Sequence, residues 1–253
     1  MNVFYSYYII IVLVMPNLLE HTLVINLDTR LDRLVHVRKE LTSIGVPAPE
    51  RFPAIKNKHG AIGCSLSHIK CLEIAKTNNW EYVFICEDDI TFTNPQVFRQ
   101  SLHKFQENSE KDGISWDVLL IGGNNCPPYN KIHNVDYCVQ ISNCQSTIGY
   151  VVGKSYYDTL IANFREGIMK LMKEPENKPQ YAIDMYWKRL QSYGRWYLIV
   201  PLTVTQMRDY SDVEKKEVNY DHLMLDLDKD WLMSRMSQQR ALSGMTCFKR
   251  PVV

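Results

Sequence analysis

The sequence lacks any block of lysine or arginine. Among its 253 residues are 29 Lys or Arg and 28 Asp or Glu, a formal net charge of +1, and the two signs are interspersed. Nucleic-acid-binding proteins gather basic side chains on one face or in one segment. We therefore expect no nucleic-acid partner.

Cysteine is sparse and shows none of the common zinc spacings. Seven cysteines are too few for a scaffold held together by disulfides. Three of them occupy expected helix or strand and are interpreted as buried apolar residues: Cys64, Cys71 and Cys86. Three others lie close together in a loop-rich stretch and leave one disulfide open in an oxidising compartment: Cys126, Cys138 and Cys144. Neither Cys-x-x-Cys nor His-Glu-x-x-His occurs, which argues against zinc.

The first nineteen residues carry no charged side chain. Residues 3–15 form an apolar run closed by Pro16. The run is shorter than the roughly 20 residues of a membrane span and matches a signal-peptide core, although it lacks a basic flank. A signal or anchor would imply the secretory pathway or membrane association through residues 3–15. Otherwise the segment is an extra strand or an extension, and the protein is cytoplasmic.

Length and composition favour one α/β domain, because 253 residues with 45% hydrophobic content can bury one large core. We expect a hydrophobic segment at 1–20, a single domain at 21–210 and a charged tail at 211–253.

Hydrophobic periodicity predicts strands that alternate with helices. The expected strands are 21–26, 50–55, 82–86, 116–121, 146–152 and 196–200. The expected helices are 31–44, 63–77, 96–107, 154–164 and 183–191, with a loop or irregular hairpin at 126–143 and a polar linker at 165–180. Thr29 with Asp32 suggests a cap for the first helix, and Asn94 followed by Pro95 suggests a cap for the third.

Three consecutive carboxylates, Glu87, Asp88 and Asp89, follow the buried strand 82–86. Acids this close repel one another, so a divalent cation, strong hydrogen bonds or a retained proton must offset the repulsion. Ligands of α/β sheets collect at the carboxyl ends of strands. The triplet is therefore a candidate catalytic site, and the alternative is a solvated turn.

Other candidates have structural alternatives of their own. Arg30 and Arg33 follow the first strand and could hold a diphosphate through forked guanidinium contacts, or be solvated helix residues. His68 is either a ligand contact or a core histidine. Asp184 is either a general base or the cap of the helix that follows it.

Four sequence blocks occur in an order that resembles glycosyltransferase family 25, the group of lipooligosaccharide and procollagen galactosyltransferases. These blocks are Val24-Ile-Asn-Leu-Asp-Thr-Arg-Leu-Asp-Arg33, Ile62-Gly-Cys-Ser-Leu-Ser-His68, Glu87-Asp88-Asp89 and Ile148-Gly-Tyr-Val151. A weaker fifth block is Ile183-Asp184 followed by Pro201 and Gln206. Each block is weak alone, but together they span about residues 22–210.

The resemblance implies a GT-A type, Rossmann-like mixed sheet flanked by helices, a UDP-sugar donor, Mn²⁺ or Mg²⁺, and inversion at the anomeric carbon. It assigns donor binding to Asn26, Leu27, Arg30, Arg33, Gly63, Ser67, His68 and Asp88. It makes the acid triplet the counterpart of the Asp-x-Asp metal site, with Asp89 and Glu87 as ligands. Inversion in one displacement requires a base for the acceptor hydroxyl, and we expect Asp184 to be this catalytic base. Glu87 is expected to act at the same site by hydrogen bonding to the ribose or by holding a neighbouring acid.

The expected function is transfer of a hexose, galactose or glucose, to a hydroxyl of a glycan or of hydroxylysine in a collagen-like protein. The associated roles would be lipopolysaccharide biosynthesis or collagen glycosylation. Two alternatives stay open: another metal-dependent transferase that uses a nucleotide, and a catalytically silent relative that acts in binding or adhesion.

Overall fold

The computed structural model describes residues 17–211 and 216–231. The expected signal or anchor at residues 3–15 and the end of the tail, residues 232–253, lie outside this range. Within the described part of the chain, no helix is both long and apolar enough to cross a membrane.

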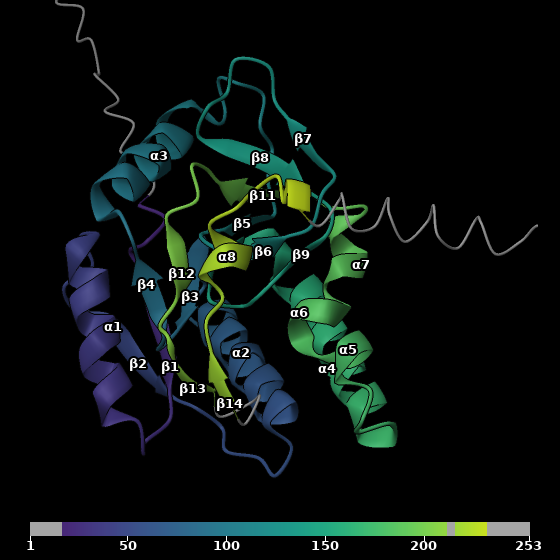
Figure 1. The fold of residues 1–253 in the computed structure, drawn as a ribbon. Coiled ribbons are helices and arrows are strands. Elements are labelled where there is room, and N and C mark those ends of the chain that lie inside the picture. The colour runs from purple at the N-terminus through teal and green to yellow at the C-terminus, as the bar shows by residue number, and fades with distance from the viewer. Residues whose placement is uncertain (1–16, 212–215, 232–253) are drawn as a thin grey trace, which may run out of the picture.

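An eight-stranded mixed sheet forms the centre of the protein (Figure 1). Its order is β2 (Glu50–Pro53), β1 (Thr22–Asn26), β3 (Tyr82–Glu87), β10 (Gly149–Gly153), β5 (Val118–Leu120), β11 (Trp196–Ile199), β8 (Cys138–Ile141) and β7 (Tyr129–Lys131). Strands β1, β2 and β3 are parallel, and β10 runs antiparallel between β3 and β5. The carboxyl ends of β1 and β3 therefore meet the beginning of β10 at one edge of the sheet.

Both faces of β3 are buried because side chains alternate between two hydrophobic cores. Phe84 and Cys86 face one core, whereas Val83 and Ile85 face the other. A strand buried on both sides reads as a continuous apolar run. This explains why the run before the acid triplet predicts the central strand correctly.

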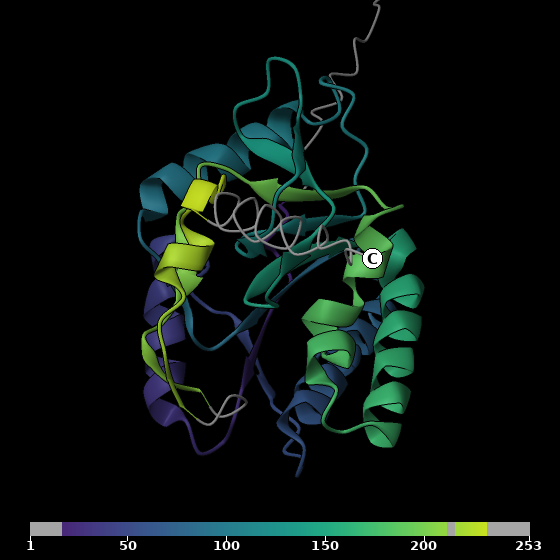
Figure 2. The same cartoon turned by 45° about the vertical axis from the view of Figure 1, so that its right-hand side comes forward.

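Helices cover the two faces of the sheet (Figures 1 and 2). The first core contains residues of α1 (Leu31–Ser43) and α3 (Pro95–Asn108), and the second contains residues of α2 (Gly60–Thr77) and α4 (Tyr157–Lys173). Shorter elements are a 3₁₀ turn (Lys154–Tyr156), α5 (Lys178–Tyr181), α6 (Ile183–Tyr186), α7 (Lys188–Gln191) and α8 (Asp221–Met224). The predicted fold class, a GT-A type α/β sheet flanked by helices, is confirmed.

Several local predictions were wrong or incomplete. The expected linker at 165–180 begins as helix, because α4 continues to Lys173 with one apolar face buried. Residues 126–143 include β7 and β8, which complete the main sheet. One of the two expected helix caps is confirmed, because Asn94 accepts a hydrogen bond from the Val97 amide (3.1 Å) at the start of α3. The other, Thr29 with Asp32, is wrong, because α1 begins without a side-chain cap.

The six cysteines in the described residues are all free thiols, so the disulfide left open by the sequence is not formed there. Cys71, Cys86, Cys138 and Cys144 are buried, and Cys64 and Cys126 are partly exposed. The expected burial of Cys64 is therefore only partly met.

The segment after β11 folds back across the sheet edge. Strand β12 (Val204–Gln206) pairs with β4 (Ile90–Phe92), and β13 (Asp209–Ser211) pairs with β14 (Lys216–Val218). Met224 and Lys229 are buried, and the Lys229 ammonium donates hydrogen bonds to backbone carbonyls of Asn125 and Asp226. This part of the expected tail packs against the sheet-bearing core.

We predict that Gly63→Ala destabilises the protein. A Cβ at this position would lie 2.5 Å from the Ile55 carbonyl oxygen, and a backbone atom cannot easily move away. We expect a loss of about 1–3 kcal/mol in the free energy of unfolding, measured by urea denaturation. Gly153→Ala is the control, since its Cβ would meet nothing closer than 3.8 Å. Equal stability of the two variants would contradict this account.

Candidate active site

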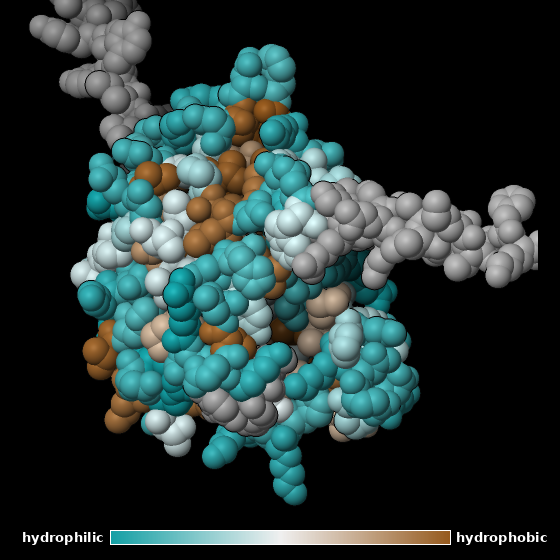
Figure 3. Space-filling model, in the orientation of Figure 1, coloured by the Kyte–Doolittle hydropathy of each residue, from teal (hydrophilic) through white to brown (hydrophobic). Residues whose placement is uncertain are grey.

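The acid triplet lies where the carboxyl ends of the parallel strands meet the beginning of β10. Glu87 ends β3, and its amide donates a hydrogen bond to the Ile148 carbonyl (3.1 Å). Asn26 ends the neighbouring β1. The surface is hollowed on this face, between α8 and α6 (Figure 3). The sequence prediction that the first and third blocks share one site therefore agrees with the geometry.

Asp88 and Asp89 are buried and share one guanidinium. Arg33 Nη1 lies 3.3 Å from Asp88 Oδ1 and 3.1 Å from Asp89 Oδ2. The Asn26 amide donates to Asp88 Oδ2 at 2.7 Å. Arg33, a residue of α1 in the first sequence block, is thus the partner that neutralises the two acids. It is therefore not the solvated helix residue that one of the two alternatives held.

Asp89 is the least compensated of the three acids. Burial, followed by the charge of Glu87, raises its pKa to about 8, although Arg33 opposes the shift. Its Oδ1 atom is buried and has no hydrogen-bond partner among the described residues. Burial also raises the pKa of Asp88, against the hydrogen bond from Asn26 and the charge of Arg33.

Glu87 lies in a different environment from its two neighbours. Its Oε1 atom accepts a hydrogen bond from Thr147 Oγ1 at 2.5 Å and lies 3.3 Å from His68 Nε2. Burial would raise the pKa of Glu87, but the hydrogen bond and charge of His68, together with Thr147, outweigh burial and lower it. Glu87 is therefore held as a carboxylate.

His68 is fully buried on α2 and is fixed from both sides. Its Nδ1 atom lies 2.8 Å from the Tyr150 hydroxyl, and the two rings stack with centroids 5.6 Å apart. The histidine thus orients Glu87 from the helix side. His68 is thus a core histidine, as one of the two alternatives held, and it also contacts the acidic site. Direct contact with a ligand stays a prediction.

Asp184 lies beside the same strand end and does not cap its own helix. Its Oδ2 atom accepts a hydrogen bond from the Ser146 amide at 2.9 Å, and α6 has no side-chain cap. Burial raises the pKa of Asp184, the hydrogen bond from the Ser146 amide lowers it, and the negative charge of Glu87 raises it further, so that the net shift is upward. A carboxylate with a raised pKa is a stronger proton acceptor. The capping alternative is therefore wrong, and the role as a base stays a prediction.

Asp209 on β13 is a member of the site that the sequence did not indicate. Its carboxylate forms ion pairs with Arg30 and with Arg33, whose Nε lies 3.2 Å away. Arg30 also contacts Asp32. An aspartate in a charged stretch carries no signal in the sequence, since its contact with α1 depends on how the segment folds back.

Three other predicted donor residues have contacts within the protein. Ser67 Oγ donates to the Gly63 carbonyl and accepts from the Ile55 amide, both at 2.8 Å. These bonds tie α2 to the end of β2. Leu27 is half-buried in the turn after β1. For Leu27, Gly63 and Ser67, contact with a donor stays a prediction.

The donor atoms around the triplet suit a hard divalent cation. Such ions prefer carboxylate oxygens, and the unpartnered Asp89 Oδ1 is available for one. The donor atoms are therefore of the right kind for such an ion, while Arg33 neutralises part of the acidic charge in this structure. Asp89 and Glu87 are the residues from which a Mn²⁺ or Mg²⁺ site could be built.

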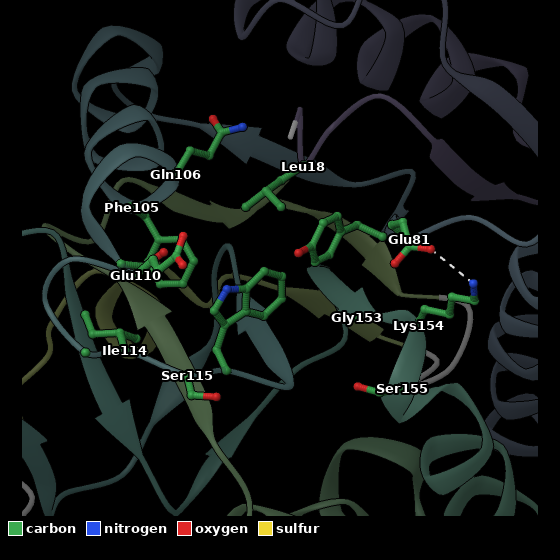
Figure 4. A pocket seen from close by; sticks show the side chains of 14 residues that line it. Leu18, Glu81, Phe105, Gln106, Glu110, Ile114, Ser115, Gly153, Lys154 and Ser155 are labelled. Atoms are coloured by element: carbon green, nitrogen blue, oxygen red, sulfur yellow. Dashed lines mark hydrogen bonds and ion pairs between the residues drawn. The ribbon is translucent and has the colours of Figure 1, made fainter. Parts of the chain in front are cut away.

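A separate cavity of about 800 Å³ lies at the opposite end of β3 (Figure 4). It is lined by Tyr82 at the start of that strand and by Gly153 at the end of β10. The Glu81–Lys154 ion pair, 3.0 Å long, closes one side. Tyr82 and Glu87 are about 17 Å apart along the strand at 3.3 Å per residue. The cavity is therefore distinct from the acidic site.

Together, the mixed sheet and the acidic, arginine-bearing site at its strand ends define an α/β protein of the GT-A type. A family model described as glycosyltransferase family 25 (LPS biosynthesis protein) matches residues 58–187. The chain belongs to glycosyltransferase family 25.

Curated relatives match over part of their length. A Haemophilus influenzae protein described as a glycosyltransferase is 31% identical over 106 residues, covering 34% of this chain and 38% of the relative. Mouse procollagen galactosyltransferase 2 is 28% identical over 96 residues, covering 37% of this chain and 15% of the relative. Human inactive glycosyltransferase 25 family member 3 is 26% identical over 128 residues, covering 50% of this chain and 20% of the relative. The match therefore spans less than two fifths of each relative.

Among solved structures, the chain is similar to a glycosyltransferase involved in the glycosylation of the major capsid of PBCV-1. The identity is 12%, the coverage is 70% of this chain and 80% of the other, and the TM-score is 0.39.

We predict that Asp89 makes the metal-free protein less stable as the pH rises. Its pKa is about 8 in the folded protein, against an ordinary 3.8, so the folded state holds the proton more tightly. The stabilisation is complete below about pH 4 and is lost as the pH rises towards 8. In urea denaturation with EDTA, Asp89→Asn should lose less stability than the wild type between pH 5 and 8. If the free energy of unfolding falls equally with pH in the wild type and in Asp89→Asn, Asp89 is not the titrating group.

Proposed function

We propose that this protein is an inverting, metal-dependent glycosyltransferase that moves a hexose from a UDP-sugar to a hydroxyl acceptor. The observation that carries the proposal is the convergence of Glu87, Asp88 and Asp89 with Arg30 and Arg33 at one strand edge. Carboxylates can hold a divalent cation, and guanidinium groups pair with phosphates in a forked geometry. A diphosphate donor needs both.

The metal would be held by Asp89 and Glu87. When bound, it would supply a positive charge that stabilises the departing UDP. The protein's own residues do the positioning. Asn26 holds Asp88 at 2.7 Å, and Thr147 and His68 hold Glu87. These bonds fix the carboxylates before a donor arrives, so little reorganisation is needed on binding.

Asp184 would take the proton from the acceptor hydroxyl. Inversion in one displacement requires a base on the acceptor side, and this carboxylate has a raised pKa. The Ser146 amide fixes the orientation of its Oδ2 atom. Ser146 directly precedes Thr147, which holds Glu87, so one short segment connects the proposed base with the acid triplet.

Galactose or glucose is the proposed sugar, with a glycan or the hydroxylysine of a collagen-like protein as acceptor. Two names support these classes: the family description refers to LPS biosynthesis, and the mouse relative is a procollagen galactosyltransferase. Lipopolysaccharide biosynthesis and collagen glycosylation are the corresponding roles.

A second candidate function is a catalytically silent binding protein, because one human relative is named inactive. The acid triplet and Asp184 favour the enzyme. A third, nucleotidyl transfer, would use the same acids to clamp a phosphoryl group. Screening UDP-sugars with Mn²⁺ separates the three. Release of UDP supports glycosyl transfer, release of sugar 1-phosphate together with UMP indicates nucleotidyl chemistry, and absence of UDP binding by calorimetry favours the silent protein.

We predict that Asp89→Asn leaves the fold intact and abolishes Mn²⁺-dependent hydrolysis of the UDP-sugar, because the amide removes the charge that would hold the cation. The assay is UDP release at increasing Mn²⁺. Asp158→Asn is the control, since its carboxylate pairs with Lys76 on the exposed surface. Near-normal turnover by Asp89→Asn would place the metal elsewhere.

For Asp184→Asn we predict that donor binding is kept and transfer is lost. The amide can still accept the Ser146 hydrogen bond but cannot take a proton. Calorimetry with UDP and transfer assays measure the two properties separately. Loss of both in a folded variant would mean that Asp184 serves donor binding instead.

A further inference from the structure

Two residues on α2 present metal-ligating atoms to the same carboxylate. Cys64 and His68 are four residues apart, so they lie on one face of the helix one turn apart. Glu87 comes from the end of the neighbouring β3. This group has none of the common zinc spacings, because its third member comes from a strand nineteen residues after His68.

The distances within the group are slightly longer than those of an occupied metal site. His68 Nε2 lies 3.3 Å from Glu87 Oε1, and Cys64 Sγ lies 3.9 Å from the same oxygen. One ligand atom from each residue falls within 4.8 Å of the others. Bonds of about 2.0–2.3 Å in a tetrahedral zinc site place neighbouring ligand atoms roughly 3.3–3.8 Å apart. Small side-chain adjustments would therefore admit the ion.

The surroundings orient the ligands as a metal site requires. The Tyr150 hydroxyl lies 2.8 Å from His68 Nδ1, so the ring presents Nε2 to the group. Metal-binding histidines usually have a hydrogen-bond partner of this kind on the ring nitrogen that does not bind the metal. Thr147 fixes Glu87 through a 2.5 Å bond. The histidine is fully buried, whereas the Glu87 side chain is 24% exposed and provides access from solvent.

We propose that Cys64, His68 and Glu87 form a binding site for zinc or a similar borderline-soft divalent ion, with the fourth position open. On binding, a metal–sulfur bond forms and the thiol proton leaves to solvent. Thiolate and imidazole ligands suit a softer ion than the carboxylates of Asp89 and Glu87 do. Glu87 belongs to both proposed sites, so zinc bound here would occupy a ligand of the harder ion. An ion held here would fix Glu87. Inhibition of transfer by zinc follows from this, and this consequence alone rests on the proposed function.

The test is titration of the purified full chain with Co²⁺, which occupies zinc sites and gives a thiolate-to-cobalt absorption band when a cysteine is a ligand. We expect a band that saturates at one equivalent and disappears when Zn²⁺ is added. Cys64→Ser should lose the band. Cys126→Ser is the matched control, because Cys126 is another partly exposed free thiol outside this group, and it should keep the band.

A band that survives in Cys64→Ser, or that is lost in Cys126→Ser, would overturn the proposal. Circular dichroism shows whether each variant folds. If Cys64→Ser does not fold, His68→Gln provides the second test, with a weakened or shifted band expected and an unchanged band contradicting the site. Calorimetry should show Zn²⁺ affinity falling at least about tenfold in Cys64→Ser.

The functional consequence is measured separately. Zn²⁺ should slow UDP-sugar hydrolysis by the wild type and have less effect on Cys64→Ser, each compared with its own zinc-free rate. A protein that gives the cobalt band but hydrolyses no UDP-sugar would refute the proposed function and leave the site standing. Active protein without the band would refute the site and leave the function.

Discussion

The ion pairs of Arg33 with Asp88 and Asp89 are the interaction on which the rest of the site depends. Two buried carboxylates next to Glu87 would repel one another strongly, and one guanidinium spans the pair at 3.3 and 3.1 Å. Because Arg33 comes from the first turn of α1, the position of this helix against β1 fixes the charge balance at the end of β3. This compensation is incomplete, because Asp89 Oδ1 is buried and has no hydrogen-bond partner among the described residues.

The antiparallel β10 supplies the other half of the site. Gly149 pairs with Cys86, so the residues just before β10 lie beside those just after Cys86. Thr147 thereby reaches Glu87, and Ser146 reaches Asp184. Gly149 permits this packing, because a Cβ there would lie 2.9 Å from Ile90 Cδ1. Gly149 of the family block thus packs closely against the strand that follows the acid triplet, at the flexible end of the Ile90 side chain.

The sequence predicted what depends on local patterns. The run before Glu87 is continuous because β3 is buried on both faces, and Asn94 with Pro95 marks a true helix start. The family blocks brought Asn26, Arg33 and the triplet to one site. The sequence could not show that Arg33 pairs with the acids, that Asp184 binds the Ser146 amide, or that Asp209 contacts α1. These contacts join residues 38 to 179 positions apart, and tertiary packing alone brings them together.

Asp209 has a thermodynamic consequence for any anion that approaches Arg30 and Arg33. Both arginines already contact its carboxylate, so an incoming phosphate exchanges one anion for another and does not meet two bare cations. The net gain is the difference between two ion pairs, and the number of charges newly neutralised is small. Binding at this point would therefore release few counterions and depend weakly on ionic strength, as an exchange of partners does.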